Sequence, residues 1–111
     1  TDERISVPVR PVPAILEEAG VRPDDVGLVW MDIEGYEPIA IRSMRSLMAR
    51  RVPIYTEFSP EFYQPGQAEA FVQILARYYE DCLVYFEDVA TPTKVRDIPI
   101  GREQLDILLL P

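Results

Sequence analysis

The sequence predicts an α/β fold with a mostly parallel sheet. Apolar runs of strand length alternate with amphipathic stretches of helical spacing, in the order strand, helix, strand, helix, strand. This alternation is the pattern of βαβαβ units, whose right-handed crossovers bring the carboxyl ends of the strands to one edge of a sheet. The 111 residues, 48% hydrophobic and 27% charged, have the size and composition of one small ordered domain.

The first elements are short. Residues 5–9 alternate in polarity but contain Pro8, which favours an edge or terminal strand. A helix is expected over 13–20, ending at Gly20. The near-continuous apolar run at 27–33 predicts a central strand covered on both faces, with Trp30 in the core.

Two helices and three strands follow. A helix should begin around 36–38, with Pro38 in its first turn and buried residues Ala40, Met44, Leu47 and Met48 at helical spacing. Strands are expected at 53–58, 82–89 and 106–110, a helix at 66–79 and a short hairpin partner at 94–98.

Acidic residues stand where two of these strands end. Asp32 and Glu34 close the 27–33 run, and Glu57 closes the next strand. Ligands of open α/β sheets bind outside the carboxyl ends of the strands, so we interpret these three as candidate catalytic residues. Glu34 and Glu37 could instead complement the positive end of the helix that starts there, but this does not explain Asp32 inside an apolar run.

Residues near these acids are candidates for substrate binding. Gly35 permits a left-handed turn that brings backbone close to a ligand. Tyr36 follows it, and Tyr63 lies in the loop after Glu57, so both could line a cleft. Glu87 and Asp88 end the third strand, where a solvated polar turn is favoured over a site.

Composition excludes several classes of function. A net charge of −8 disfavours binding to nucleic acid. The absence of His removes His-dependent triads and most zinc sites, and a single Cys allows no internal disulfide. No run approaches the roughly 18 apolar residues of a membrane helix, so no membrane partner and a cytoplasmic location are expected.

One stretch resembles a known family. Residues 26–60, VGLVWMDIEGYEPIAIRSMRSLMARRVPIYTEFSP, resemble the FkbM-type methyltransferases. The family signature is an apolar strand ending in Asp-[Val/Ile]-Glu-Gly-x-Glu, then an amphipathic helix and a strand with an internal Glu. Here the signature reads Asp32-Ile33-Glu34-Gly35-Tyr36-Glu37, and Glu57 follows the helix.

The resemblance implies S-adenosylmethionine-dependent O-methyl transfer to a hydroxyl of a small molecule or sugar. It also implies that residues 1–111 are one domain, the C-terminal half of a Rossmann-like class I methyltransferase fold, whose last strand is antiparallel and inserted between the two strands before it. No Gly-x-Gly occurs in the sequence. We therefore expect the glycine-rich, cofactor-binding half to be absent, so that this chain alone is inactive and binds S-adenosylmethionine weakly or not at all.

The resemblance also suggests roles. Asp32 would orient the acceptor hydroxyl or attract the cationic sulfur, Glu34 would serve as general base, and Glu57 would bind the acceptor or fix the site. Alternatively, the acids bind a divalent metal that activates the hydroxyl.

The residues bear on two other classes of function. A carboxylate-dependent exonuclease is disfavoured because the required His or Tyr-x3-Asp element is missing. The non-enzymatic alternative is a catalytically inactive oligomerisation or partner-binding domain derived from the same fold. An isolated half-sheet would expose an edge strand, so we expect a homo-oligomer formed through that edge.

Overall fold

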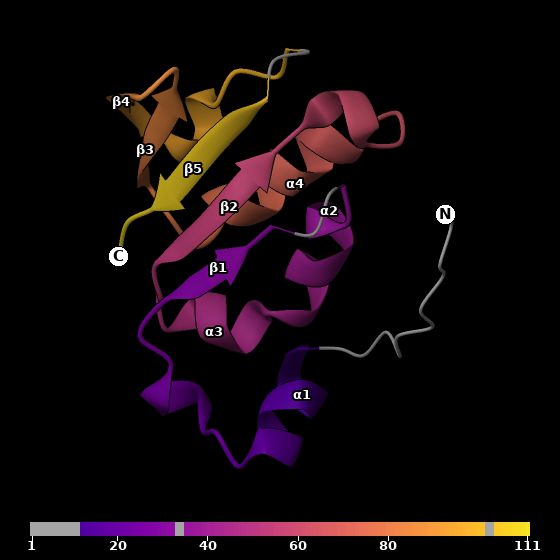
Figure 1. The fold of residues 1–111 in the computed structure, drawn as a ribbon, viewed down its shortest axis with the longest axis vertical. Helices are drawn as coiled ribbons and strands as arrows, with labels where there is room; N and C mark the ends of the chain where they lie inside the picture. Colours follow the sequence, from indigo (N-terminus) through magenta and orange to yellow (C-terminus); the bar gives the residue numbers. More distant parts are fainter. Residues whose placement is uncertain (1–11, 33–34, 102–103) are drawn as a thin grey trace, which may run out of the picture.

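The computed structural model describes residues 12–32, 35–101 and 104–111. In this part of the chain, one five-stranded sheet is accompanied by helices that come before and between its strands (Figure 1). The elements are α1 (Val12–Ala19), η1 (Pro23–Asp25), β1 (Val29–Met31), α2 (Glu37–Ala40), η2 (Ile41–Ser43), α3 (Arg45–Ala49), β2 (Ile54–Phe58), η3 (Pro60–Phe62), α4 (Gln67–Ala76), β3 (Asp81–Phe86), β4 (Val89–Lys94), η4 (Val95–Asp97) and β5 (Leu105–Leu109), where η marks a 3-10 helix.

The sheet order is β1-β2-β5-β3-β4, and the prediction of a mostly parallel sheet is wrong. Only β1 and β2 pair in parallel, whereas β2–β5, β5–β3 and β3–β4 are antiparallel. The reason is the place of β5, which runs back between β2 and β3 and separates two strands that point the same way. The predicted insertion of an antiparallel last strand is confirmed, but its effect is a mixed α/β sheet.

One face of the sheet carries the core. Ile54, Thr56 and Phe58 of β2 are buried, and β5 buries every second residue in the same way. Helix α4 lies behind β2 in Figure 1 and packs Phe71 against Phe58, with ring centroids 5.9 Å apart. Of the predicted helical positions, Met44, Leu47 and Met48 are buried and Ala40 is half-buried. In α4, Phe71 and Leu75 are buried, while Ile74 is half-buried.

The helix predicted from 36–38 onward is divided into α2, η2 and α3, which together turn its apolar residues toward the core. The hairpin partner of β3 is β4, because Glu87 and Asp88 form a two-residue turn, so the prediction of a partner strand at 94–98 is wrong. Val95–Asp97 form η4 instead. The predicted strand at 5–9 lies outside the described residues. Across the described part, none of the helices combines the length and apolar character that crossing a membrane demands.

The opposite face of the sheet is open near β1, so the prediction of a core Trp30 is wrong. Trp30 is 68% exposed and stacks on Tyr55 of β2 with ring centroids 4.6 Å apart. Tyr55 in turn meets Tyr85 of β3 at 5.9 Å. β1 is the end strand of the described sheet, and only Met31 of its three residues is buried.

Candidate functional site

Two of the predicted acids lie together at one edge of the sheet. Met31 pairs with Thr56 in the parallel register, so the following residues, Asp32 and Glu57, stand side by side where β1 and β2 approach their carboxyl ends. The two carboxyl groups are within hydrogen-bonding reach of each other. Asp32 is exposed and Glu57 is half-buried, so the pair is open to solvent on one side.

The surroundings make ionisation of Glu57 harder. Partial burial raises the pKa of Glu57 above its usual value, and the hydrogen bond and negative charge of Asp32 raise it further. Ser59 acts in the other direction, because its hydroxyl donates a hydrogen bond of 2.9 Å to Glu57 Oε1 and favours the carboxylate. The raised pKa lets Glu57 hold or accept a proton nearer to neutral pH than an isolated Glu can.

The loop after β2 supports this pair through Ser59 and Tyr63. The backbone N–H of Ser59 donates to the Tyr63 hydroxyl at 3.2 Å, and the ring of Tyr63 packs edge-on against Phe58 and Phe71. Burial raises the pKa of the Tyr63 phenol, so it stays protonated as a hydrogen-bond donor. Tyr63 is half-buried beside the acids, and its predicted role in substrate binding stays a prediction.

Glu37, which the sequence places at the start of a helix, is fully buried. Its Oε1 accepts a hydrogen bond of 3.0 Å from the Gly35 N–H and lies 3.4 Å from the Tyr63 hydroxyl. Gly35 has a φ of +96°, so the left-handed turn predicted there is confirmed. A Cβ at this position would meet Phe62 Cβ at 3.4 Å, which adds crowding to the strained φ.

The buried Glu37 therefore contacts both the Gly35 turn and Tyr63 of the loop after β2. The available signal for Glu37 was its place as the third acid of the Asp-Ile-Glu-Gly-Tyr-Glu motif. No comparable signal marked Ser59, because Ser-Pro after a strand reads as an ordinary turn.

Three further predictions concern Glu34, Tyr36 and the turn at Glu87 and Asp88. Glu34 lies outside the described residues, so its proposed role stays a prediction. Tyr36 occupies the N-cap position of α2 with its side chain 65% exposed, and its role in substrate binding is likewise a prediction. Glu87 and Asp88 are exposed turn residues, as the solvated interpretation requires.

Within residues 12–32, 35–101 and 104–111, no three His, Cys, Asp or Glu side chains are grouped closely enough to hold a metal ion. What the described arrangement offers is a proton-accepting pair with net negative charge. Such a pair suits a cationic reactant or a hydroxyl that must lose its proton.

In this mixed α/β domain, the paired carboxyls lie at the carboxyl ends of adjacent parallel strands, which is where open α/β sheets commonly bind ligands. Comparison with known families identifies the family of the chain. Residues 1–89 match the model of the methyltransferase FkbM domain, and the chain belongs to this methyltransferase family. Neither the curated proteins nor the solved structures include a match to the chain.

Proposed function

We propose that this chain contributes the acceptor side of an S-adenosylmethionine-dependent O-methyltransferase, acting on a hydroxyl of a small molecule or sugar. Membership of the FkbM family supports methyl transfer. The observation that carries the proposal further is the contact between Asp32 and Glu57, since a neutral hydroxyl becomes an effective nucleophile when a nearby base takes its proton.

One feature of the chain fits a cofactor with a cationic centre. Asp32 is exposed beside Glu57, and a carboxylate there would attract a positively charged sulfur. S-adenosylmethionine, when bound, supplies a methyl group carried on such a sulfur. The chain has no Gly-x-Gly loop to hold the rest of the cofactor, so we expect the 111 residues alone to bind it weakly.

The proposed roles follow from burial and hydrogen bonds. Asp32 orients the acceptor hydroxyl, and the Asp32–Glu57 pair takes its proton as the oxygen forms its bond to the methyl carbon. Ser59 holds Glu57 Oε1 in place through its hydrogen bond. Glu37 and Tyr63 are positioning residues, since they are tied to the Gly35 turn and to the loop after β2.

The test is methyl transfer by the complete protein that carries this chain, measured as S-adenosylhomocysteine released in the presence of a panel of monosaccharides. Loss of general-base catalysis costs about 100-fold or more, so Asp32→Asn and Glu57→Gln should each lower kcat by at least that factor. Glu61→Gln is the matched control, because it removes the same charge at an exposed position of η3.

Full turnover by either pair variant would remove the proposed roles. Micromolar binding of S-adenosylmethionine by the 111-residue chain in a calorimetric titration would contradict the expectation that the cofactor is held mainly by other residues.

A further inference from the structure

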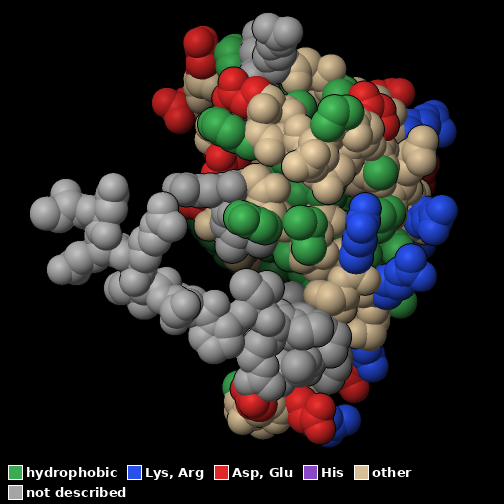
Figure 2. All heavy atoms as spheres, turned by 90° about the vertical axis from the view of Figure 1, so that its right-hand side faces the viewer, with side chains coloured by type: hydrophobic (Ala, Val, Ile, Leu, Met, Phe, Trp, Pro, Cys, Tyr) green, Lys and Arg blue, Asp and Glu red, His purple; other side chains and the backbone are tan. Residues whose placement is uncertain are grey.

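Exposed apolar side chains lie close to the acidic pair, where α2 meets η3. Tyr36 at the start of α2 is 65% exposed, Ile39 within α2 is 50% exposed, and Phe62 at the end of η3 is 66% exposed. Figure 2 looks onto the side of the molecule that carries α2, and green hydrophobic side chains reach the surface in the middle of this face. Large apolar groups that stay in water at one place often mark a ligand-binding surface. We call Tyr36, Ile39 and Phe62 the apolar patch.

Backbone contacts bring the three residues of the apolar patch together. The Ile39 N–H donates a hydrogen bond of 3.1 Å to the Tyr36 carbonyl, so these two residues are neighbours on one turn of α2. Gly35, directly before Tyr36, lies against η3, because a Cβ on Gly35 would be 3.4 Å from Phe62 Cβ. The close approach of the two segments therefore depends on the glycine.

Further contacts fix the apolar patch relative to the acids. The Phe62 N–H donates a hydrogen bond of 3.0 Å to the Ser59 carbonyl, and the Ser59 hydroxyl donates to Glu57 Oε1. On the α2 side, Oε1 of the buried Glu37 lies 3.4 Å from the Tyr63 hydroxyl in the loop after β2. The same two segments thus carry the apolar patch and support the acidic pair, and a surface held in this way needs little ordering when a ligand binds.

The exposure of Phe62 contrasts with the burial of its neighbour. Tyr63 turns its ring onto Phe58 and Phe71 of the core, whereas the ring of Phe62 stays in water. A polar side chain at an exposed position of η3 would leave less apolar surface in water, so the core does not account for an aromatic ring there.

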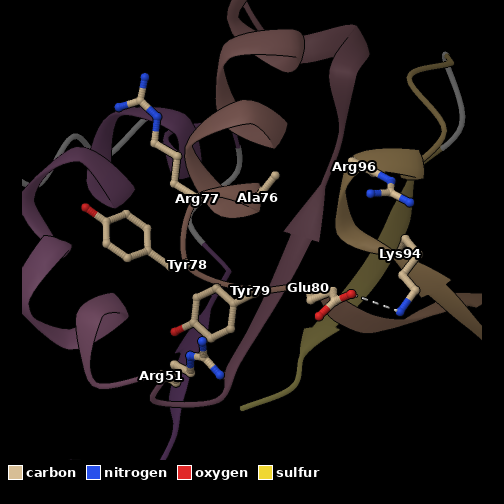
Figure 3. Close-up of a pocket in the computed structure, with 8 residues that line it drawn as sticks. All are labelled: Arg51, Ala76, Arg77, Tyr78, Tyr79, Glu80, Lys94 and Arg96. Atoms are coloured by element: carbon tan, nitrogen blue, oxygen red, sulfur yellow. Dashed lines mark ion pairs between the residues drawn. The ribbon is translucent and has the colours of Figure 1, made fainter.

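The hollow of about 350 Å³ drawn in Figure 3 is less suited to an acceptor. It is lined by the segment that leads from α4 into β3, at the opposite end of the strands from the acidic pair. In Figure 3, Arg77 and Tyr78 point to one side of it and Arg96 lies on the other, with Arg51 apart from both. Its polar side chains therefore do not converge on one ligand.

We propose that the apolar patch binds an apolar group of the methyl acceptor, so that the acceptor is an alcohol or phenol with an aromatic or alkyl group. The inference rests on the proposed function, because it names the class of molecule whose hydroxyl reaches the acidic pair. An acceptor that spans both features places its hydroxyl at Asp32 and Glu57 and removes its apolar group from water at Tyr36, Ile39 and Phe62. A monosaccharide without an apolar group would use the polar part alone.

The experiment is an NMR titration of the 111-residue chain with phenylbutanol, compared with glucose. The backbone amide signals of Gly35, Ile39 and Phe62 should shift with phenylbutanol and not with glucose. Phe62→Ser and Ile39→Ser should each weaken phenylbutanol binding by about tenfold, because each removes apolar surface that the ligand would cover. Phe86→Ser is the matched control, since Phe86 is an exposed phenylalanine at the end of β3 and should leave binding unchanged.

The amide spectrum of each variant also reports whether it is folded, and two variants of the patch are compared for this reason. Equal affinity in Phe62→Ser, Ile39→Ser and the unchanged chain would overturn the proposal. So would an equal loss in Phe86→Ser, or shifts confined to Trp30 and Tyr55, which would place phenylbutanol on the open face of the sheet.

Methyl transfer by the complete protein separates this inference from the proposed function. Phe62→Ser should raise KM for phenylbutanol by about tenfold and leave kcat nearly unchanged, whereas Glu57→Gln should lower kcat. Binding at the apolar patch without any methyl transfer would remove the proposed function and leave a site for apolar alcohols. Methyl transfer without binding at the apolar patch would remove this inference and leave the proposed function.

Discussion

At the scale of single residues, the site is defined by the unequal surroundings of neighbouring acids. Asp32 and Glu57 share an edge of the sheet, yet Glu57 is the half-buried partner and its pKa is raised, first by burial and then by Asp32. Glu37 is buried completely and is bound to the Gly35 backbone. The surroundings of Glu57 therefore favour its protonated form, whereas Glu37 is held by the backbone of the Gly35 turn.

The raised pKa of Glu57 predicts how stability depends on pH. A carboxyl whose folded pKa lies above its unfolded value favours the folded state below the unfolded pKa, and this contribution is lost as pH rises through the folded pKa. Glu57→Gln has no such loss. The Tm of Glu57→Gln relative to the unchanged chain should therefore increase between about pH 4 and about pH 7.

Thermal melts monitored by circular dichroism across this pH range would measure the difference. Glu61→Gln removes an exposed carboxylate of η3 and should show a smaller change with pH. A Tm difference for Glu57→Gln that is constant with pH, or that falls as pH rises, would contradict the interpretation of Glu57.

The sequence could predict which acids lie at the candidate site, but not which residues surround each element. The juxtaposition of Asp32 and Glu57 followed from strand ends and parallel pairing, which are local features plus one topological rule. The exposure of Trp30 could not be predicted in the same way. An apolar run shows that a strand can be covered on both faces, whereas the elements that cover it lie elsewhere in the chain.

At the scale of elements, periodicity located most of the described helices and strands within a few residues, but it misplaced the hairpin partner of β3 and did not determine which strands are neighbours. Pairing depends on the path of the whole chain, and β5 enters between β2 and β3 only at its end. The hairpin β3–β4 lies earlier in the sequence than predicted, and the reason is local. Glu87 and Asp88 adopt φ values of +48° and +64°. A Glu-Asp pair is not among the residue pairs that predict such a tight turn.

This hairpin carries the second prediction. Two-residue turns with positive φ at both positions favour Asn-Gly or Asp-Gly, so a glycine at the second position removes backbone strain. Asp88→Gly should stabilise the chain by roughly 0.5–1 kcal/mol. Thermal melts should then show Tm higher by roughly 2–6 °C.

Asp97→Gly is the control for loss of the same charge, because Asp97 is exposed at the end of η4 and is not among the described residues with positive φ. It should leave Tm unchanged or lower it. If Asp88→Gly fails to raise Tm, backbone strain is not what limits the hairpin.

At the scale of the whole molecule, the sheet is covered unequally. The face of β2 that carries Phe58 is buried, while Trp30, Tyr55 and Tyr85 form an aromatic row on the other face. In the described part of the chain, β1 pairs with β2 alone and its second edge has no strand partner. An edge strand beside exposed aromatic surface is an arrangement that favours pairing between chains.

We propose that two copies of this chain associate through β1 and the aromatic row. Trp30→Lys should weaken this association, because a lysine on an edge strand opposes strand pairing and replaces a ring that is 68% exposed. Sedimentation equilibrium over a range of protein concentrations measures the monomer–dimer constant directly. Tryptophan emission gives a second readout, since the sequence contains a single Trp and its burial in a dimer would shift emission to shorter wavelength as concentration rises.

Phe62→Lys is the matched control, because Phe62 is 66% exposed on η3, outside the sheet. It makes the same exchange of an exposed aromatic for a cation, so an equal loss of dimer in both variants would indicate nonspecific hydrophobic association. A monomer at every concentration tested would contradict pairing through β1. Dimer loss restricted to Trp30→Lys would place the interface on the sheet, beside the edge where Asp32 follows β1, and would make the acidic pair a neighbour of that interface.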